Sequence, residues 1–331
     1  MLRVGLLGAG RIGAVHAAAI TRHVGSELVA ISDFHPEVAD RLASEHQAAS
    51  RSTEEIISDP DIDAVLIATS TDTHSDLIEA ATAAGKAVLC EKPVDLSLAR
   101  ARACEEAIAG SGQPVMIGFN RRFDVNFAQL KSALEAGEIG KPELLSITSF
   151  DPAPPPVSYI KVSGGLFRDM MIHDFDMSQF LMGEAPVTVM ATASSLVDRE
   201  IGDAGDVDTA VVTLSYDDGR IAVIRNSRRA AYGYDQRVEL LGSEGLLEVE
   251  NVQENRLVKS TSEGIMSAKP TYFFLERYMA SYAAEWSAFV AAVTDGTTVP
   301  VTLQEGISAL AMAEAATMSI RSGKPVALAE I

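Results

Sequence analysis

Leu2-Arg3-Val4-Gly5-Leu6-Leu7-Gly8-Ala9-Gly10-Arg11-Ile12-Gly13 is the stretch of the sequence that decides the fold. Residues 2–7 predict a buried strand, and residues 14–23 have the apolar spacing of a helix. A second apolar run, 27–32, follows and ends at Asp33. A strand, a G-x-G-x-x-G turn, a helix and a second strand with an acidic end together are typical of dinucleotide binding.

Each glycine of this turn has a separate use in such a site. Gly8 permits the tight turn, Gly10 lets a pyrophosphate approach the backbone, and Gly13 allows the helix to pack closely. The N–H groups at the helix start, including those of Arg11 and Ile12, and the positive end of the helix dipole favour the phosphates. The alternative interpretation is an ordinary turn between a strand and a helix.

Asp33 predicts which dinucleotide binds. A carboxylate at the end of the second strand accepts hydrogen bonds from the ribose hydroxyls and repels a 2′-phosphate, so NAD is favoured over NADP. Arg11 lies in the phosphate-binding turn and is a possible partner for a 2′-phosphate, which leaves the strictness of this preference open.

The sequence divides near residue 119. Before it, strands alternate with helical patterns, which predicts right-handed βαβ units in a doubly wound parallel sheet of the Rossmann type. The expected strands are 2–7, 27–32, 63–68, 86–90 and 115–118. We therefore assign residues 1–119 to an NAD-binding domain and residues 120–331 to a domain for substrate binding and oligomerisation.

The second part is richer in β-structure. After a predicted helix at 123–136, turn signals such as Asp217-Asp218-Gly219 and Gly242-Ser243-Glu244-Gly245 separate the runs. The expected strands are 143–150, 187–197, 208–215, 220–228, 235–242 and 245–250. This pattern predicts an α+β domain with a large, mostly antiparallel open sheet. We expect Pro152–Pro156 to form a stiff lip over the site and Lys259–Lys269 to be an exposed loop.

Two further groups of polar residues follow predicted strands of the first domain. Cys90-Glu91-Lys92-Pro93 ends the strand 86–90, where ligands of open α/β sheets gather, so Lys92 is a candidate for binding a substrate hydroxyl. Thr69, Ser70 and His74 end the strand before it and are candidates for lining the nicotinamide ribose. A surface lysine in a turn and a histidine without a role are the alternatives.

His173 is the only histidine after residue 74. In a helix, Asp169 and His173 would share one face at i and i+4, which is the arrangement of a general base with an orienting carboxylate. A solvated helix start with one core histidine is the plain alternative. A metal-dependent hydrolase, with Asp169, His173, Asp174 and Asp176 as ligands, leaves the glycine turn unexplained.

Composition limits the partners. The chain has 331 residues, 47% of them hydrophobic, and a formal charge of −19. Such acidity disfavours nucleic acid and anionic membranes as partners. The two cysteines, Cys90 and Cys104, form no disulfide or zinc pattern. A first strand that starts at Leu2 leaves no room for a signal peptide, and no apolar run is long enough to span a membrane, so we expect a cytoplasmic protein.

The chain resembles the glucose-fructose oxidoreductase/inositol dehydrogenase/MocA (Gfo/Idh/MocA) family across essentially its whole length. The residues that carry this resemblance are Gly8–Gly13, Glu91-Lys92-Pro93, Gly118–Phe123, and Asp169 with His173. Within that family, Asp151–Pro156, Gly165–Asp169 and Tyr232–Asp235 are similar to the inositol 2-dehydrogenases.

The resemblance implies oxidation of a cyclic polyol with NAD, most directly of myo-inositol to its 2-keto product. We expect no metal, because a lysine and a histidine already supply the electrophile and the base. It implies that Lys92, Asp169 and His173 are catalytic, that Glu91 belongs to the cofactor site, and that homo-oligomers, dimers or tetramers, form through the open sheet. The polyol contacts that it implies are Arg121, Asp151, Tyr234 and Tyr282. Ser149 departs from the histidine of some relatives. A dehydrogenase of scyllo-inositol or another sugar, and a non-catalytic NAD-sensing protein, are the alternatives.

Overall fold

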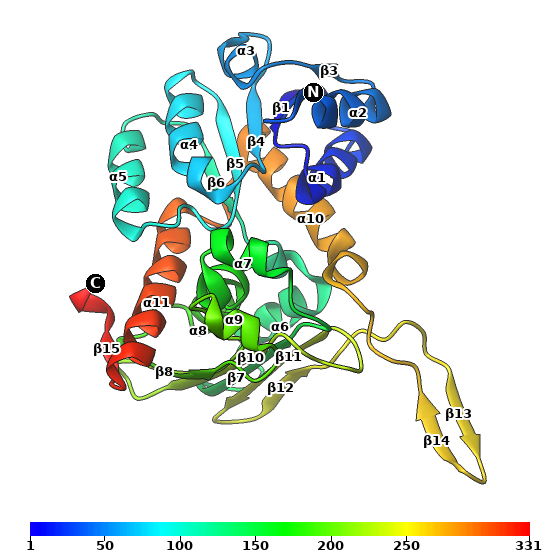
Figure 1. Cartoon of the computed structure of the whole chain (residues 1–331), viewed down its shortest axis with the longest axis vertical. Helices are drawn as coiled ribbons and strands as arrows, with labels where there is room; N and C mark the ends of the chain where they lie inside the picture. The colour runs from blue at the N-terminus through cyan, green and yellow to red at the C-terminus, as the bar shows by residue number, and fades with distance from the viewer. The chain divides into compact units, whose positions relative to one another are not determined.

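The computed structural model describes residues 1–331, which form two compact units (Figure 1). The first comprises Met1–Phe123 and Met279–Leu310, and the second comprises Asp124–Tyr278 and Ala311–Ile331. The chain thus returns to the first unit at residues 279–310, whereas we expected one division into 1–119 and 120–331. The physical reason lies in contacts far apart in sequence, because Trp286 Nε1 donates to Ser26 Oγ at 2.9 Å and the N–H of Ile117 donates to the carbonyl of Val301 at 3.1 Å.

The sheet of the first unit is parallel throughout and has the strand order β3-β2-β1-β4-β5-β6. Its strands are β1 (Leu2–Leu7), β2 (Ser26–Ser32), β3 (Ala49–Ser50), β4 (Ala64–Ile67), β5 (Ala87–Glu91) and β6 (Val115–Gly118). The helices between them are α1 (Arg11–Arg22), α2 (Pro36–His46), α3 (Thr53–Ser58), α4 (His74–Ala83) and α5 (Leu98–Ile108). This confirms the doubly wound Rossmann sheet.

The strands of this sheet are nearly continuous apolar runs because both of their faces are covered. Every residue of β4 and β5 is buried. The expected strands agree with the observed ones to within one residue at each end. Only β3 was not predicted, since two residues carry no periodic signal.

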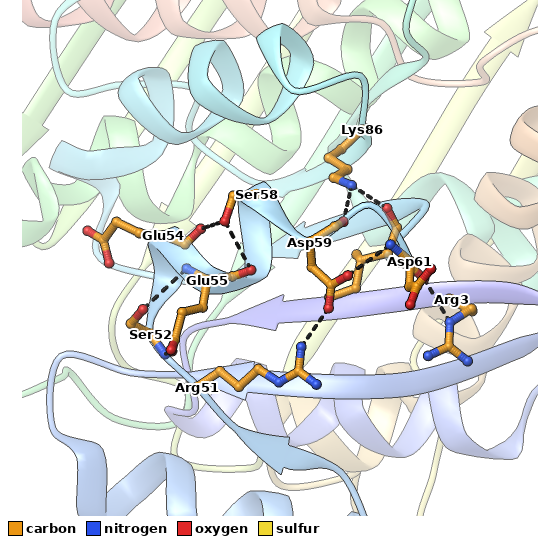
Figure 2. A network of polar contacts seen from close by, with 10 residues as sticks. Arg3, Arg51, Ser52, Glu54, Glu55, Ser58, Asp59, Asp61 and Lys86 are labelled. Atoms are coloured by element: carbon orange, nitrogen blue, oxygen red, sulfur yellow. Dashed lines mark hydrogen bonds and ion pairs between the residues drawn. The ribbon is translucent and has the colours of Figure 1, made fainter.

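A polar network fixes the connection from β3 through α3 to β4 (Figure 2). Ser52 and Glu55 form a capping box at the start of α3, and this hydrogen bonding lowers the pKa of Glu55. Arg51 pairs with Asp59 at 2.6 Å, and Lys86 Nζ donates to the carbonyls of Asp59 and Ile62. Arg51 and Lys86 therefore hold the turn between α3 and β4.

The second unit contains a seven-stranded sheet of order β12-β11-β7-β10-β9-β8-β15, antiparallel except between β7 and β10. Its strands are β7 (Pro142–Phe150), β8 (Thr188–Ser194), β9 (Thr209–Ser215), β10 (Ile221–Ser227), β11 (Asp235–Gly242), β12 (Leu246–Val249) and β15 (Val326–Ala327). The mostly antiparallel open sheet is confirmed, and both predicted turns join neighbouring strands.

Burial alternates along these strands, as expected for a sheet with one covered face. Helices α6 (Val125–Glu135) and α8 (Ile172–Met182) lie on one side of the sheet (Figure 1). Ser319, in α11 (Leu303–Ser322), accepts a hydrogen bond from the N–H of Ala191 in β8. The other face exposes apolar side chains, among them Val211, Ile221 and Leu241.

Three parts of the second unit differ from expectation. Residues 259–267 are exposed as expected, but they belong to a hairpin of β13 (Val258–Thr261) and β14 (Gly264–Ser267) that extends away from the sheet (Figure 1). The strand expected at 187–197 ends at Ser194, and α9 (Arg199–Asp203) follows, with Asp198 as its N-cap. A helix that was not expected, α7 (Val157–Ser163), directly follows the proline segment.

The remaining expectations concern cysteines and membranes. Cys90 and Cys104 are buried free thiols, and burial raises the pKa of Cys104 to about 12. None of the helices combines the length and the hydropathy that a membrane span requires.

Candidate active site

The glycine turn has the shape that a dinucleotide needs. Gly8 adopts φ +100°, and a Cβ atom there would lie 2.3 Å from the carbonyl oxygen of Ala68. A Cβ on Gly13 would lie 2.1 Å from the carbonyl oxygen of Gly8, so a side chain would separate α1 from the turn. Gly10 is exposed and has no atom within 4 Å of an added Cβ, which leaves the backbone open to a phosphate. The turn therefore fits a pyrophosphate at the start of α1.

Asp33, which follows β2, contacts this turn directly. Its Oδ2 accepts the N–H of Ala9 at 2.7 Å, and its Oδ1 accepts the N–H of His35 at 2.9 Å. The carboxylate is therefore fixed beside the phosphate-binding loop. Its partly exposed position is consistent with ribose binding.

Lys92 follows β5, whose last residue, Glu91, is buried. Glu91 Oε1 lies 2.7 Å from Nε2 of the buried His16 on α1, and Glu91 Oε2 accepts the N–H of Lys92 at 3.3 Å. The ring of Tyr282, in α10 (Phe274–Thr294), meets the His16 ring edge-on, with centroids 5.3 Å apart. Residues from β5, α1 and α10 thus contact one another next to Lys92.

His74, the first residue of α4, is buried and linked to the same region. Its Nδ1 lies 2.8 Å from the carbonyl oxygen of Pro93, and its Nε2 lies 3.2 Å from that of Thr69. Burial lowers the pKa of His74, which favours the neutral ring, and the single N–H of a neutral ring donates to only one of these two carbonyls. His74 thus lies between the loop after β4 and the segment after Lys92. Thr69 Oγ1 bonds to Thr73 Oγ1 at 2.7 Å, while Ser70 is exposed.

In the second unit, the segment before His173 is not the regular helix that we expected. Asp169 lies in a π-helical turn, η3 (Leu166–Met170), whereas His173 lies in the first turn of α8. Gly165 precedes η3 at φ +81°, and a Cβ there would lie 2.5 Å from Asp206 Oδ1. Asp206 also accepts the N–H of Leu166, which fixes the start of the turn. The i, i+4 relation of a single α-helix therefore does not describe this pair.

The carboxylate of Asp169 has two neighbours that were not predicted. The hydroxyl of Tyr159 donates to Oδ1 at 3.0 Å, and Arg228 Nη2 lies 3.5 Å from Oδ2. Arg228 is 1% exposed, so its charge acts with little screening by water. Burial raises the pKa of the nearby Asp206. These two contacts hold the Asp169 side chain in place.

Asp174, next to His173, is fully buried. Ser149 Oγ donates to its Oδ1 at 2.6 Å, and Asn226 Nδ2 donates to its Oδ2 at 2.8 Å. Ser149, where some relatives have a histidine, therefore supports the start of α8. No group of three or more His, Cys, Asp or Glu side chains is placed to hold a metal ion.

The expected polyol residues are divided between the units. Arg121, in η2 (Asn120–Phe123), and Tyr282 are buried in the first. Asp151 follows β7 in the second, where its N–H donates to the carbonyl of Ser227 at 2.9 Å. Tyr234 is buried against Tyr278 with ring centroids 6.0 Å apart. The cofactor residues and Lys92 belong to the first unit, and Asp169 and His173 belong to the second.

A Rossmann sheet with an open glycine turn and an acidic residue after β2 defines an NAD-binding domain. Residues 2–119 match the NAD-binding Rossmann fold of the Gfo/Idh/MocA oxidoreductase family, and residues 131–328 match the C-terminal alpha/beta domain of the same family. The chain belongs to this family, and it is an NAD-dependent oxidoreductase.

Relatives in the family are similar over their full length. The inositol 2-dehydrogenase of Rhizobium meliloti (strain 1021) is 47% identical, with 99% of each chain covered. The crystal structure of a probable dehydrogenase from Thermotoga maritima has a TM-score of 0.97 and 46% identity, with 100% of each chain covered. The structure of scyllo-inositol dehydrogenase from Lactobacillus casei with bound NAD(H) and scyllo-inositol has a TM-score of 0.93 and 28% identity, and covers 99% of each chain.

Proposed function

We propose that the protein oxidises one hydroxyl group of a cyclic polyol to a ketone, and that its substrate is myo-inositol, oxidised at C2. The observation that carries this proposal is the 47% identity to an inositol 2-dehydrogenase over 99% of both chains. The presence of Lys92, Asp169 and His173 supports catalysis over a purely sensing role.

NAD⁺ supplies the hydride acceptor when it is bound at the glycine turn. His173 removes the hydroxyl proton as the C–H bond on the same carbon breaks. Asp169, held by Tyr159 and Arg228, orients the imidazole and stabilises its protonated form. The ammonium group of Lys92 binds the reacting oxygen and stabilises its developing negative charge.

Polar side chains around the ring would decide between polyols. Arg121, Asp151, Tyr234 and Tyr282 are the proposed contacts, and a buried donor or acceptor left unpaired by a wrong isomer separates substrates by up to ~10⁴-fold. Scyllo-inositol is the second candidate, because a solved relative binds it. Ser149 bonds to Asp174 in this chain, so a histidine at that position would rearrange the wall beside His173.

A substrate panel tests the proposal. We expect NADH formation with myo-inositol, and weaker formation with scyllo-inositol and glucose, when absorbance is followed in mildly alkaline buffer. Analysis of the product by mass spectrometry should show loss of two hydrogen atoms. NADH formation with another sugar, but none with myo-inositol, would agree with dehydrogenase activity and would refute myo-inositol as the substrate.

Asp33 allows a prediction about the cofactor. We expect kcat/KM for NAD⁺ to exceed that for NADP⁺ at least ~10-fold, because the carboxylate repels a 2′-phosphate. Asp33→Ala should narrow this ratio, mainly by lowering kcat/KM for NAD⁺. Asp40→Ala, an exposed carboxylate on α2, is the control and should leave the ratio unchanged. Equal use of both cofactors by the unaltered protein would refute the prediction.

We also propose that two copies of the second unit pair through the open face of the seven-stranded sheet. Val211, Ile221 and Leu241 are each more than two fifths exposed on this sheet. Exposed apolar side chains on one face of a sheet are typical of protein interfaces, and closed symmetry makes a dimer or tetramer the expected assembly.

A further inference from the structure

Glu285 is a buried carboxyl group for which the proposed reaction has no use. It lies on the same face of α10 as Tyr278, Tyr282 and Phe289, and it is 0% exposed. Neither of its carboxyl oxygens has a hydrogen-bond partner. An ionised carboxylate in this position would be very unfavourable, since burying an unpaired charge costs far more than burying a neutral group.

Besides burial, the negative charge of Glu91, at the end of β5, raises the pKa of Glu285. Glu91 also bonds to His16 from α1, and Tyr282, one turn before Glu285, packs against the His16 ring. The charge of Glu91 also acts on His74 from α4, where it opposes the larger effect of burial, which lowers the pKa of His74. We refer to Glu285, Glu91, His16 and Tyr282 as the α10 cluster. All four residues belong to the first unit.

The α10 cluster reaches two residues of the proposed active site. Glu91 Oε2 accepts the N–H of Lys92, and Tyr282 is a proposed substrate contact. We propose that Glu285 is a positioning residue, which acts through Glu91 and His16 to fix Lys92 and Tyr282. The role of Lys92 in this inference rests on the proposed function.

The charge state of Glu285 explains how it could act. Burial, and then the charge of Glu91, raises the pKa of Glu285 well above its usual range. A neutral Glu285 leaves a single carboxylate beside His16, whereas two adjacent carboxylates would repel each other. Folding raises the pKa of Glu285, so its protonated form adds to the free energy of unfolding. This contribution is complete below the pKa of Glu285 in the unfolded chain and is lost as pH rises through its pKa in the folded protein.

Glu285→Gln tests the charge state, since glutamine keeps the shape of the neutral acid. We expect the unfolding constant of the wild type, relative to that of this variant, to increase by about tenfold per pH unit above about pH 5, until the folded pKa is reached. Urea unfolding followed by fluorescence at several pH values measures the ratio without any substrate. A ratio that does not change with pH would overturn the inference.

Glu285→Ala tests positioning, with Val290→Ala as the matched control. Val290 is another buried residue of α10, outside the cluster. We expect Glu285→Ala to lower kcat at least ~10-fold with little change in NAD⁺ affinity, Glu285→Gln to restore most of the turnover, and Val290→Ala to lower stability alone. Unchanged kcat in Glu285→Ala, or equal losses in the alanine and glutamine variants, would refute positioning. The unfolding series needs no substrate, so it holds or fails independently of the substrate assignment.

Discussion

His173→Ala is expected to lower kcat by about 10²–10⁴-fold, which is the usual contribution of a general base. Affinity for NAD⁺ should be nearly unchanged, because the glycine turn and Asp33 belong to the other unit. Steady-state kinetics with the best substrate of the panel, together with NAD⁺ titration by protein fluorescence, would measure both quantities.

His35→Ala is the control for this experiment, since His35 is an exposed histidine two residues after Asp33. It should retain normal turnover. If His173→Ala also turned over at nearly the normal rate, His173 would be a structural residue at the start of α8, and another group would have to accept the proton.

Lys92→Ala is expected to lower kcat/KM by about 10²–10³-fold, the range found when one charge-stabilising donor is removed. Both kcat and the KM for the polyol should change, because the same ammonium group binds the hydroxyl before and during the reaction. Initial rates at varied polyol concentration, with NAD⁺ saturating, would separate the two effects.

Lys92→Arg is the informative companion variant. It keeps the positive charge but replaces a compact ammonium group with a planar guanidinium group, so it should recover only part of the activity. A change in KM alone, with normal kcat, would show that Lys92 binds the polyol but does not stabilise the transition state.

The first unit was well predicted from sequence because its signals are local. The run of residues 2–13 contains its own strand, turn and helix start, and the geometry of Gly8 and Gly13 follows from contacts within that turn and with the residues just after β4. Apart from the two-residue strands β3 and β15, the strands of both sheets were similarly visible, since their apolar residues have either continuous or alternating spacing.

Contacts between distant residues could not be predicted in this way. Arg228 follows β10 and Tyr159 lies in α7, so the fold brings both to Asp169 from other parts of the sequence, and neither has a local pattern that indicates this contact. The π-helical turn depends on Asp206, which lies 40 residues from Leu166. Glu285 did leave a signal, because a single acidic residue occupies an apolar face with helical spacing.

The hairpin of β13 and β14 shows a further limit. Serine, threonine and glycine in this stretch are typical of a loop, and every residue of the two strands is exposed, so burial gives no alternating pattern. The pairing of Val258 with Ser267 and of Ser260 with Ile265 is therefore invisible to a hydrophobicity argument.

The bond between Asp33 and Ala9 links cofactor choice to the rigidity of the loop that holds the phosphates. A carboxylate at this position disfavours the 2′-phosphate of NADP⁺, but its removal would also leave the N–H of Ala9 without its acceptor. A redesign should therefore supply a neutral acceptor, such as asparagine or serine, before adding a positive charge for the 2′-phosphate. In this chain, changing the cofactor and repairing the glycine turn are a single design problem.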